Sequence, residues 1–286
     1  MGRRAKNTRI RPTLLSRKHR KAPNAALSSK TSRTVINRHH TLQKKLAQAV
    51  ASGDSITAEG LEAEIDANGG LEWYQQASIA GQSEKRGGDS SKILMDWIKE
   101  AQPSKKMIDL PSLRLLEVGA LSTTNACSKS PIFQVTRIDL HSQHPDIMSQ
   151  DFMGRPIPIN DGEKFDIISL SLVLNYVPSP AQRGEMLRRT TSFLQHTKLE
   201  NPQISALFPS LFLVLPAPCV TNSRYLDEKR LINIMASLGY SLHRQKLSSK
   251  LLYQLWILKN QGGTLKFKKE KVREGKRRNN FAIIVE

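Results

Sequence analysis

The chain carries LLEVGA at residues 115–120 and RIDL shortly afterwards, at residues 137–140. They lie at the ends of two predicted strands, residues 113–118 and 134–140, among the short, largely apolar runs that begin at residue 113. Gly119 follows the first strand and Asp139 lies at the end of the second, 20 residues further on. This spacing is typical of the first β-α-β unit of a Rossmann-like sheet that binds a nucleotide-type ligand.

The residues after Gly119 restrict the kind of ligand. A glycine lets the backbone approach a ligand closely, and a carboxylate such as Asp139 accepts hydrogen bonds from ribose hydroxyls. Residues 120–125 contain no further glycine, whereas a pyrophosphate needs several approaching amides. NAD and FAD are therefore disfavoured. S-adenosylmethionine has no phosphate and tolerates a poorer loop.

The rest of the second half predicts an α/β domain. Helices are expected at about residues 179–194 and 227–238, the second closed by Gly239. Strands are expected at residues 165–170, 211–216, 251–258 and 281–285. Strands that alternate with helices form a mostly parallel sheet covered on both faces, and the last two would form its antiparallel C-terminal edge. The expected fold is a Rossmann-like α/β domain with an N-terminal helical extension.

The expected domain organisation has three parts. Residues 1–40 form a basic, disordered tail, and residues 41–110 form the helical extension. Residues 111–286 form the ligand-binding domain, with a basic insertion at 266–278.

Charge is unevenly distributed. Residues 1–53 hold 14 Lys and Arg and no Asp or Glu, residues 54–265 hold 22 of each sign, and residues 266–286 hold 8 basic and 3 acidic side chains. A tail of one sign binds a polyanion, and such binding is sequence-independent and salt-sensitive. The alternative is a solubilising or nuclear-import tail. An anionic membrane is less well supported, because the tail has no apolar face.

Other protein classes are disfavoured. No stretch approaches 18 consecutive apolar residues, and the N-terminus lacks the apolar middle of a secretory signal. Cys127 and Cys219 form neither a disulfide framework nor a zinc pattern, so no metal is expected. We expect a soluble, intracellular and monomeric protein.

Several side chains are candidate cofactor contacts besides Gly119 and Asp139. Asp151 and Phe152 follow the second strand, where an acidic–aromatic pair could contact an adenine ring. Glu117 on the first strand is included, as is Arg86 in the stretch RGGD at 86–89. That stretch has the composition of an ordinary surface loop, but it could also line a ligand cavity.

The loop after the strand at 165–170 contains Asn175 and Tyr176. Ligands of open α/β sheets bind outside the carboxyl ends of the strands, so this loop should face the methyl group of a bound S-adenosylmethionine. Tyr176 could instead be a packing aromatic.

These motifs together resemble a known family. The sequence is similar, over about residues 40–260, to the fungal base methyltransferases of large-subunit (25S) ribosomal RNA that act on adenine N1. The resemblance lies in residues 73–75, 81–83, 86–91, 116–120, 137–140, 150–152, 169–178, 213–216 and 222–225. The same family pattern includes animal proteins that bind S-adenosylmethionine as nutrient sensors.

The resemblance implies a nucleolar enzyme of the class I methyltransferase fold whose S-adenosylmethionine touches Gly119 and Asp139. Its partner would be ribosomal RNA or the pre-ribosomal large subunit. Asn175 is then the candidate for a hydrogen bond to the base and Tyr176 for stacking on it, as the catalytic pair. A sensor without methyl transfer, an assembly factor with a degenerate site, and a protein methyltransferase are the alternatives.

Overall fold

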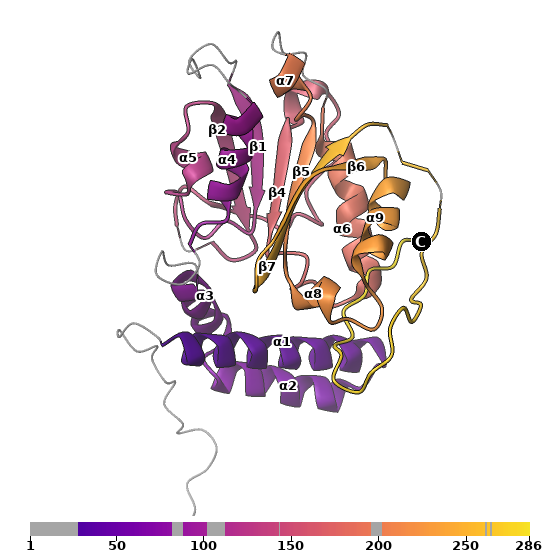
Figure 1. Ribbon diagram of the computed structural model, residues 1–286. Coiled ribbons are helices and arrows are strands. Elements are labelled where there is room, and N and C mark those ends of the chain that lie inside the picture. Colours follow the sequence, from indigo (N-terminus) through magenta and orange to yellow (C-terminus); the bar gives the residue numbers. More distant parts are fainter. Residues whose placement is uncertain are drawn as a thin grey trace, which may run out of the picture. The chain divides into compact units, whose positions relative to one another are not determined.

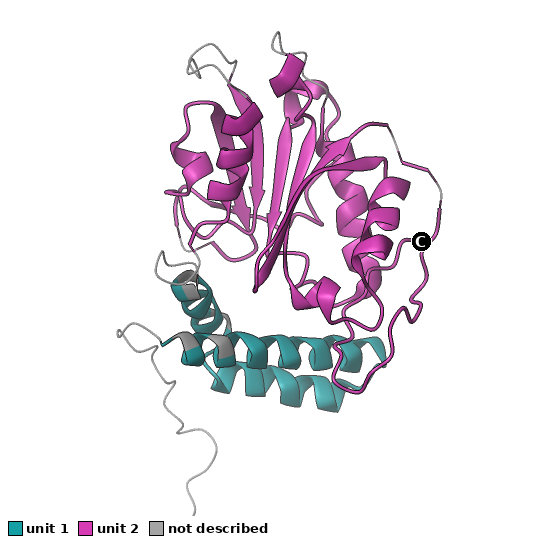
Figure 2. Ribbon diagram, viewed as in Figure 1, with its two compact units in different colours: residues 1–81 teal, residues 82–286 magenta. Residues whose placement is uncertain are grey.

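The computed structural model describes residues 28–81, 88–101, 112–142, 144–195, 202–260, 262–263 and 265–286. The chain divides into two compact units between Gly81 and Gln82 (Figure 2). Residues 91–101 thus fall in the second unit, whereas the expected boundary was at residue 110.

The second unit contains one seven-stranded sheet in the order β3-β2-β1-β4-β5-β7-β6 (Figure 1). The neighbouring strands β3, β2, β1, β4 and β5 run parallel, and β7 is antiparallel to both β5 and β6. The strands are β1 (Leu113–Val118), β2 (Phe133–Asp139), β3 (Met148–Ser149), β4 (Ile167–Ser171), β5 (Ser210–Pro216), β6 (Tyr240–Leu247) and β7 (Leu251–Leu258). The predicted mostly parallel sheet with an antiparallel C-terminal edge is confirmed.

Helices cover both faces of this sheet. They are α4 (Ser91–Ala101), α5 (Ala126–Lys129), α6 (Pro180–Phe193), α7 (Pro202–Ser205), α8 (Pro218–Thr221) and α9 (Glu228–Ser237). One core packs α6 and α9 against Leu116 and its face of the sheet, and a second packs α4 and α5 against Leu115 and the opposite face. Alternate residues of a strand enter opposite cores, which explains why both neighbours are apolar.

Two elements near the C-terminus differ from expectation. β6 was not predicted, because this edge strand is largely exposed and polar after Tyr240. Residues 281–285 were predicted to be a strand but are irregular and form one isolated bridge, between Val285 and Phe267. Their backbone groups bond elsewhere: Val285 pairs with Phe267, and the Ile284 amide donates to the Pro180 carbonyl over 3.0 Å.

The first unit consists of three helices: α1 (Ser29–Ala51), α2 (Ser55–Ala67) and α3 (Gly70–Gly81). α1 begins earlier than expected, so residues 29–40 are helical rather than part of a tail. Ser28 caps this helix by accepting a hydrogen bond from the Thr31 amide, and His39 stacks on Tyr74 of α3 with ring centroids 4.6 Å apart. Tertiary contacts thus stabilise a polar segment that has no helical signature of its own.

Within the described ranges, no helix is long and apolar enough to cross a membrane.

Candidate active site

The carboxyl ends of β2, β1 and β4 lie side by side. Val118 at the end of β1 pairs with Ile138 on one side and with Leu170 on the other. The residues that follow these three strands therefore meet at one edge of the sheet, where ligands of open α/β sheets bind. This edge brings together Gly119, Asp139 and the loop that contains Asn175 and Tyr176.

Gly119 requires a glycine for two reasons. Its φ is +74°, in the left-handed region that other residues rarely adopt. A Cβ at this position would also lie 2.6 Å from Val173 Cγ2, in the loop after β4. Gly119 thus allows the β1 and β4 ends to pack closely, an effect separate from the approach of a ligand that the sequence suggested.

Glu117 is a half-buried acid on β1. One carboxylate oxygen accepts a hydrogen bond of 2.7 Å from Asn125 Nδ2, while the other, Oε2, is buried and has no hydrogen-bond partner among the described residues. Burial raises the pKa of Glu117 to about 7, and the Asn125 hydrogen bond and the charge of Arg137 only partly oppose this shift. A buried carboxyl group with an unused oxygen is suited to a ligand that donates hydrogen bonds or carries a positive charge.

Asp139 lies at the end of β2, where its Oδ1 accepts a hydrogen bond of 2.9 Å from the His141 amide. This bond holds the carboxylate at the carboxyl edge. Asp151 lies further along, after β3, where it is exposed and accepts a bond of 2.8 Å from the Met153 amide.

The loop after β4 is tightly constrained. Leu172 has a φ of +59°, which is unusual for a residue other than glycine, and its amide donates to the Val214 carbonyl over 2.9 Å. The turn that follows contains Asn175 and Tyr176, both half-buried. Asn175 Oδ1 is buried and has no hydrogen-bond partner in the described part of the chain. Strain of this kind is typical of functional loops.

Arg183 on α6 fixes the end of this loop. Its guanidinium is buried and donates to the carbonyls of Val177 at 2.8 Å and Pro178 at 3.2 Å, and also to Ala282 at 2.7 Å. It lies 4.3 Å from the centre of the Phe281 ring. The composition of α6 did not distinguish this arginine from a solvent-exposed one.

The GDSS stretch at residues 88–91 also meets this edge. Asp89 accepts bonds from the Ser91 amide at 2.8 Å and from the Ala126 amide at the start of α5. Ser90 Oγ lies 2.7 Å from Ser171 Oγ at the end of β4. Asp89 belongs to the RGGD stretch that was predicted either to line a ligand cavity or to be a surface loop, whereas Ser90 and Ser171 were not predicted as site residues. Arg86 lies outside the described residues.

Phe152 occupies a different position from the other candidates. Its side chain is only 2% exposed and packs against Phe193 of α6, with ring centroids 5.3 Å apart. The ring belongs to the core that also contains Val118, Ile138 and Leu174, so its side chain is not exposed at the edge of the sheet, and its contact with an adenine ring stays a prediction.

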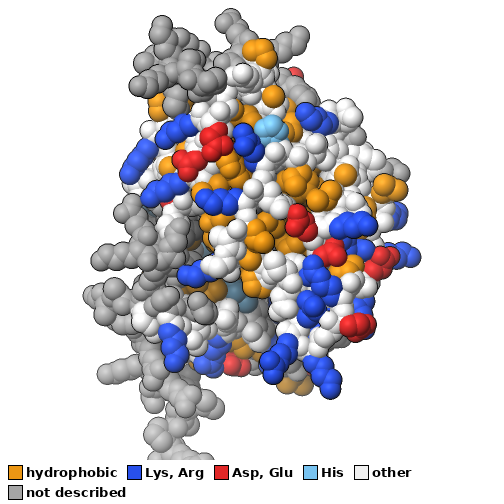
Figure 3. Space-filling model, viewed as in Figure 1, with side chains coloured by type: hydrophobic (Ala, Val, Ile, Leu, Met, Phe, Trp, Pro, Cys, Tyr) orange, Lys and Arg blue, Asp and Glu red, His pale blue; other side chains and the backbone are white. Residues whose placement is uncertain are grey.

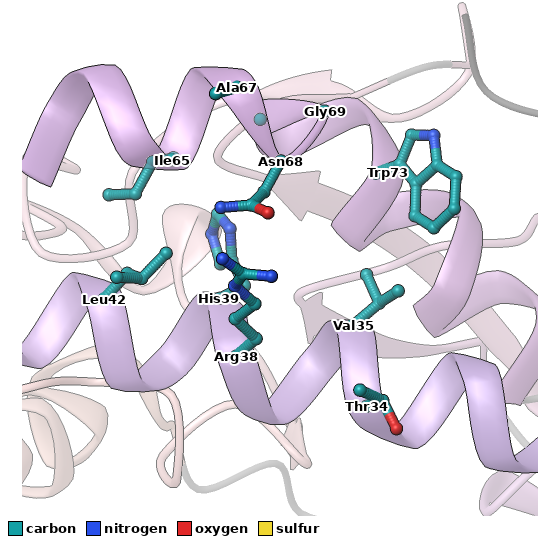
Figure 4. Close-up of a pocket in the computed structure, with 11 residues that line it drawn as sticks. Thr34, Val35, Arg38, His39, Leu42, Ile65, Ala67, Asn68, Gly69 and Trp73 are labelled. Atoms are coloured by element: carbon teal, nitrogen blue, oxygen red, sulfur yellow. The ribbon is translucent and has the colours of Figure 1, made fainter. Parts of the chain in front are cut away.

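The first unit contains a cavity lined by residues of its three helices. Its lining includes Val35, His39 and Leu42 of α1 and Trp73 of α3 (Figure 4). None of the predicted cofactor or catalytic residues lines it. In the described part of the chain, no group of three or more His, Cys, Asp or Glu side chains is arranged to hold a metal ion.

The sheet order with its antiparallel β7, together with polar side chains at the ends of β1, β2 and β4, defines a Rossmann-like class I methyltransferase. Enzymes of this class take their methyl group from S-adenosylmethionine. The unpartnered Glu117 Oε2 and Asn175 Oδ1 fit a polar, cationic molecule of this kind.

Residues 59–283 match the family described as 25S rRNA (adenine(2142)-N(1))-methyltransferase, Bmt2, and the chain belongs to this family. It is 41% identical over 252 residues to a Schizosaccharomyces pombe protein named 25S rRNA adenine-N(1) methyltransferase, covering 87% of this chain and 89% of that protein.

Two further comparisons are more partial. The chain is 42% identical over 224 residues to the Saccharomyces cerevisiae 25S rRNA (adenine(2142)-N(1))-methyltransferase, a match that covers 77% of this chain and 61% of that protein. Among solved structures, the pyocyanin biosynthetic protein PhzM matches with a TM-score of 0.40 and 11% identity, over 80% of this chain and 73% of that one.

Proposed function

We propose that this chain transfers a methyl group from S-adenosylmethionine to N1 of an adenine in 25S ribosomal RNA, in the nucleolus, during ribosome biogenesis. Membership of the family supports the reaction. The observation that carries the site is the pair of buried, unpartnered oxygens, Glu117 Oε2 and Asn175 Oδ1, on neighbouring strand ends.

The proposed roles follow from the position of each side chain. Glu117 and Asp139 would hold the donor. Glu117 would bind the cationic groups of S-adenosylmethionine, and Asp139 would bind the hydroxyls of its ribose. Asn175 and Tyr176 would hold the target base, by hydrogen bonding and stacking respectively. In this proposal Asp151 and Arg86 remain candidate contacts of S-adenosylmethionine.

S-adenosylmethionine, when bound, supplies a methyl group attached to a positively charged sulfur. Adenine N1 has its own lone pair, which forms the new N–C bond as the C–S bond breaks and its electron pair stays on sulfur. No general base is needed, because N1 carries no proton to remove. The protein residues must align N1 with the methyl group and accommodate the positive charge of the product. N1 lies on the pairing edge, so the base must be unpaired or flipped out.

The test is tritiated methyl transfer from S-adenosylmethionine to 25S rRNA that lacks the modification, followed by nucleoside analysis. We expect label in 1-methyladenosine with the wild type and none with Asp139→Ala. Asn175→Ala and Tyr176→Ala should lower transfer far more than donor binding. Asn233→Ala, an exposed change on α9, is the control.

Two outcomes would contradict the proposal. Tight donor binding without transfer to naked rRNA or to pre-ribosomal particles would identify a sensor instead. Equal losses of donor binding and transfer in Asn175→Ala and Tyr176→Ala would remove these residues from the base-binding role.

A further inference from the structure

Positive charge in the second unit is densest near the C-terminus. Residues 82–265 carry 22 basic and 16 acidic side chains, whereas the 13 residues from 266 to 278 carry eight basic and two acidic ones. On the face drawn in Figure 3, carboxylates lie beside Lys and Arg side chains in several places. We call residues 265–286 the C-terminal strap.

The backbone of the strap is fixed beside the carboxyl end of β5. Arg224, in the NSRY motif that follows α8, donates to the carbonyls of Arg278 at 2.6 Å and Lys276 at 3.1 Å. Its own carbonyl accepts from the Val272 amide over 2.8 Å. One guanidinium, bound to carbonyl oxygens of the strap, thus imposes a defined geometry on a segment of like charges.

The end of the strap is fixed to the loop after β4. Ile284 donates to the Pro180 carbonyl at 3.0 Å, and Arg183 bridges the carbonyls of Ala282 and Val177. The packing here is close, because a Cβ on Gly184 would lie 1.7 Å from the Ile284 carbonyl oxygen. The strap therefore runs along the edge that holds the proposed base-binding loop (Figure 1).

Most of the positive charge of the strap is not neutralised internally. Glu270 pairs with Arg230 at 2.7 Å and Glu274 pairs with Lys271 at 2.8 Å. Lys268, Lys276 and Arg277 are exposed, and none of the three forms an ion pair within the described residues. Holding like charges close together costs free energy, which a bound polyanion offsets.

We propose that Lys268, Lys276 and Arg277 bind backbone phosphates of the RNA substrate next to the nucleotide that is methylated. This inference rests on the proposed function, since it assigns the RNA path at the same site. A strap held through its carbonyls fixes the backbone positions from which its cationic side chains extend, so they orient the substrate as well as attract it.

The test compares two triple variants of the full chain. The strap variant is Lys268→Gln/Lys276→Gln/Arg277→Gln. The control is Lys99→Gln/Lys129→Gln/Lys259→Gln, three exposed lysines at the opposite, amino edge of the parallel strands. Binding of an unmodified 25S rRNA fragment is measured across a salt series, separately from methyl transfer and from donor binding.

The strap variant should raise the KM for RNA about tenfold or more and lower the log–log salt slope of binding by about 2, at roughly 0.7 for each phosphate that is no longer neutralised. Donor affinity and kcat at saturating RNA should stay unchanged, and the control should match the wild type. The inference is overturned if the strap variant binds RNA like the wild type, if both variants weaken binding equally, or if the wild type does not bind RNA.

Failure of the proposed function gives a different result. If RNA binding depends on the strap but the wild type transfers no methyl group, the proposed reaction is wrong. The phosphate-binding role of the strap is then still supported.

Discussion

Burial raises the pKa of Glu117 to about 7 from its ordinary value of 4.5, so this carboxyl group titrates near neutral pH. In the unfolded chain the proton leaves at the ordinary pKa, whereas the folded protein keeps it up to about pH 7. The contribution of this group to stability is therefore present at low pH and is lost as the pH rises from about 4.5 to about 7. The loss is about 3 kcal/mol, at roughly 1.4 kcal/mol per pKa unit.

Glu117→Gln removes the titration but keeps an oxygen that can accept the Asn125 hydrogen bond. We expect the variant to gain up to about 3 kcal/mol in free energy of unfolding, relative to wild type, between pH 5 and pH 8. Urea unfolding of the donor-free protein at both pH values measures this difference. Glu62→Gln, an exposed change on α2, controls for general charge effects. A gain that is the same at both pH values would show that Glu117 does not titrate as its burial indicates.

The positions of some site residues could be predicted from the sequence, and those of others could not. Gly119 and Asp139 could be placed at the same edge because parallel strands present their carboxyl ends together. The pairing of Ser90 with Ser171 could not, since it joins residues 81 positions apart through the packing of α4. Phe152 looked like a ligand contact, but aromatic residues next to a strand end serve the core equally well, and here the ring is buried.

At the scale of elements, Arg183 links α6 to both the β4 loop and the C-terminal strap. Arg183→Lys keeps a positive charge but cannot reach all three carbonyls that the guanidinium binds, so buried acceptors lose their donors. We expect the free energy of unfolding to fall by about 2–4 kcal/mol. We also expect kcat for methyl transfer to fall more than donor affinity, because the loop that contains Asn175 and Tyr176 loses its support.

Arg188→Lys is the matched control on the same helix, since its half-exposed side chain pairs with Glu185 and donates to the Glu286 carbonyl but makes no hydrogen bond to the loop after β4. This change should cost less than about 1 kcal/mol. Chemical unfolding, donor titration and single-turnover transfer are compared for the two variants. A loss in Arg183→Lys that is equal in donor affinity and kcat would indicate a purely structural role.

The strands that could be predicted are those that are buried on both faces of the sheet. β1, β5 and β7 are covered on both faces, so they are largely apolar, although β1 includes Arg114 and Glu117 and β7 includes Gln254. β6 lies at the sheet edge and is mostly polar after Tyr240, so its sequence lacks the apolar run from which the other strands were predicted. Residues 281–285 are as apolar as a strand, yet their partners are Pro180, Arg183 and Phe267, and no local pattern encodes those partners.

At the scale of the whole molecule, the two sources of positive charge should act differently. Residues 1–27 contain nine Lys and Arg and no acid, and they lie outside the described residues. Charge in a basic tail, as the sequence predicts here, would add affinity for RNA without positioning it, whereas the backbone of the strap is held beside the site. The N-terminal charge should therefore change how much RNA is bound at a given salt concentration, and leave kcat unaltered.

Deletion of residues 1–27 tests this difference. We expect the log–log salt slope of RNA binding to fall by roughly 0.7 for each phosphate that these residues neutralise, to at most about 6, with donor affinity and kcat unchanged. We also expect a fluorescent fusion of the full chain, expressed in yeast, to accumulate in the nucleolus as proposed, and the deletion variant to do so less. A chain whose residues 1–27 are scrambled keeps the same charge and should retain the binding, because counterion release does not depend on residue order. If scrambling were as damaging as deletion, residues 1–27 would recognise RNA by their sequence, and the division of roles between tail and strap would be wrong.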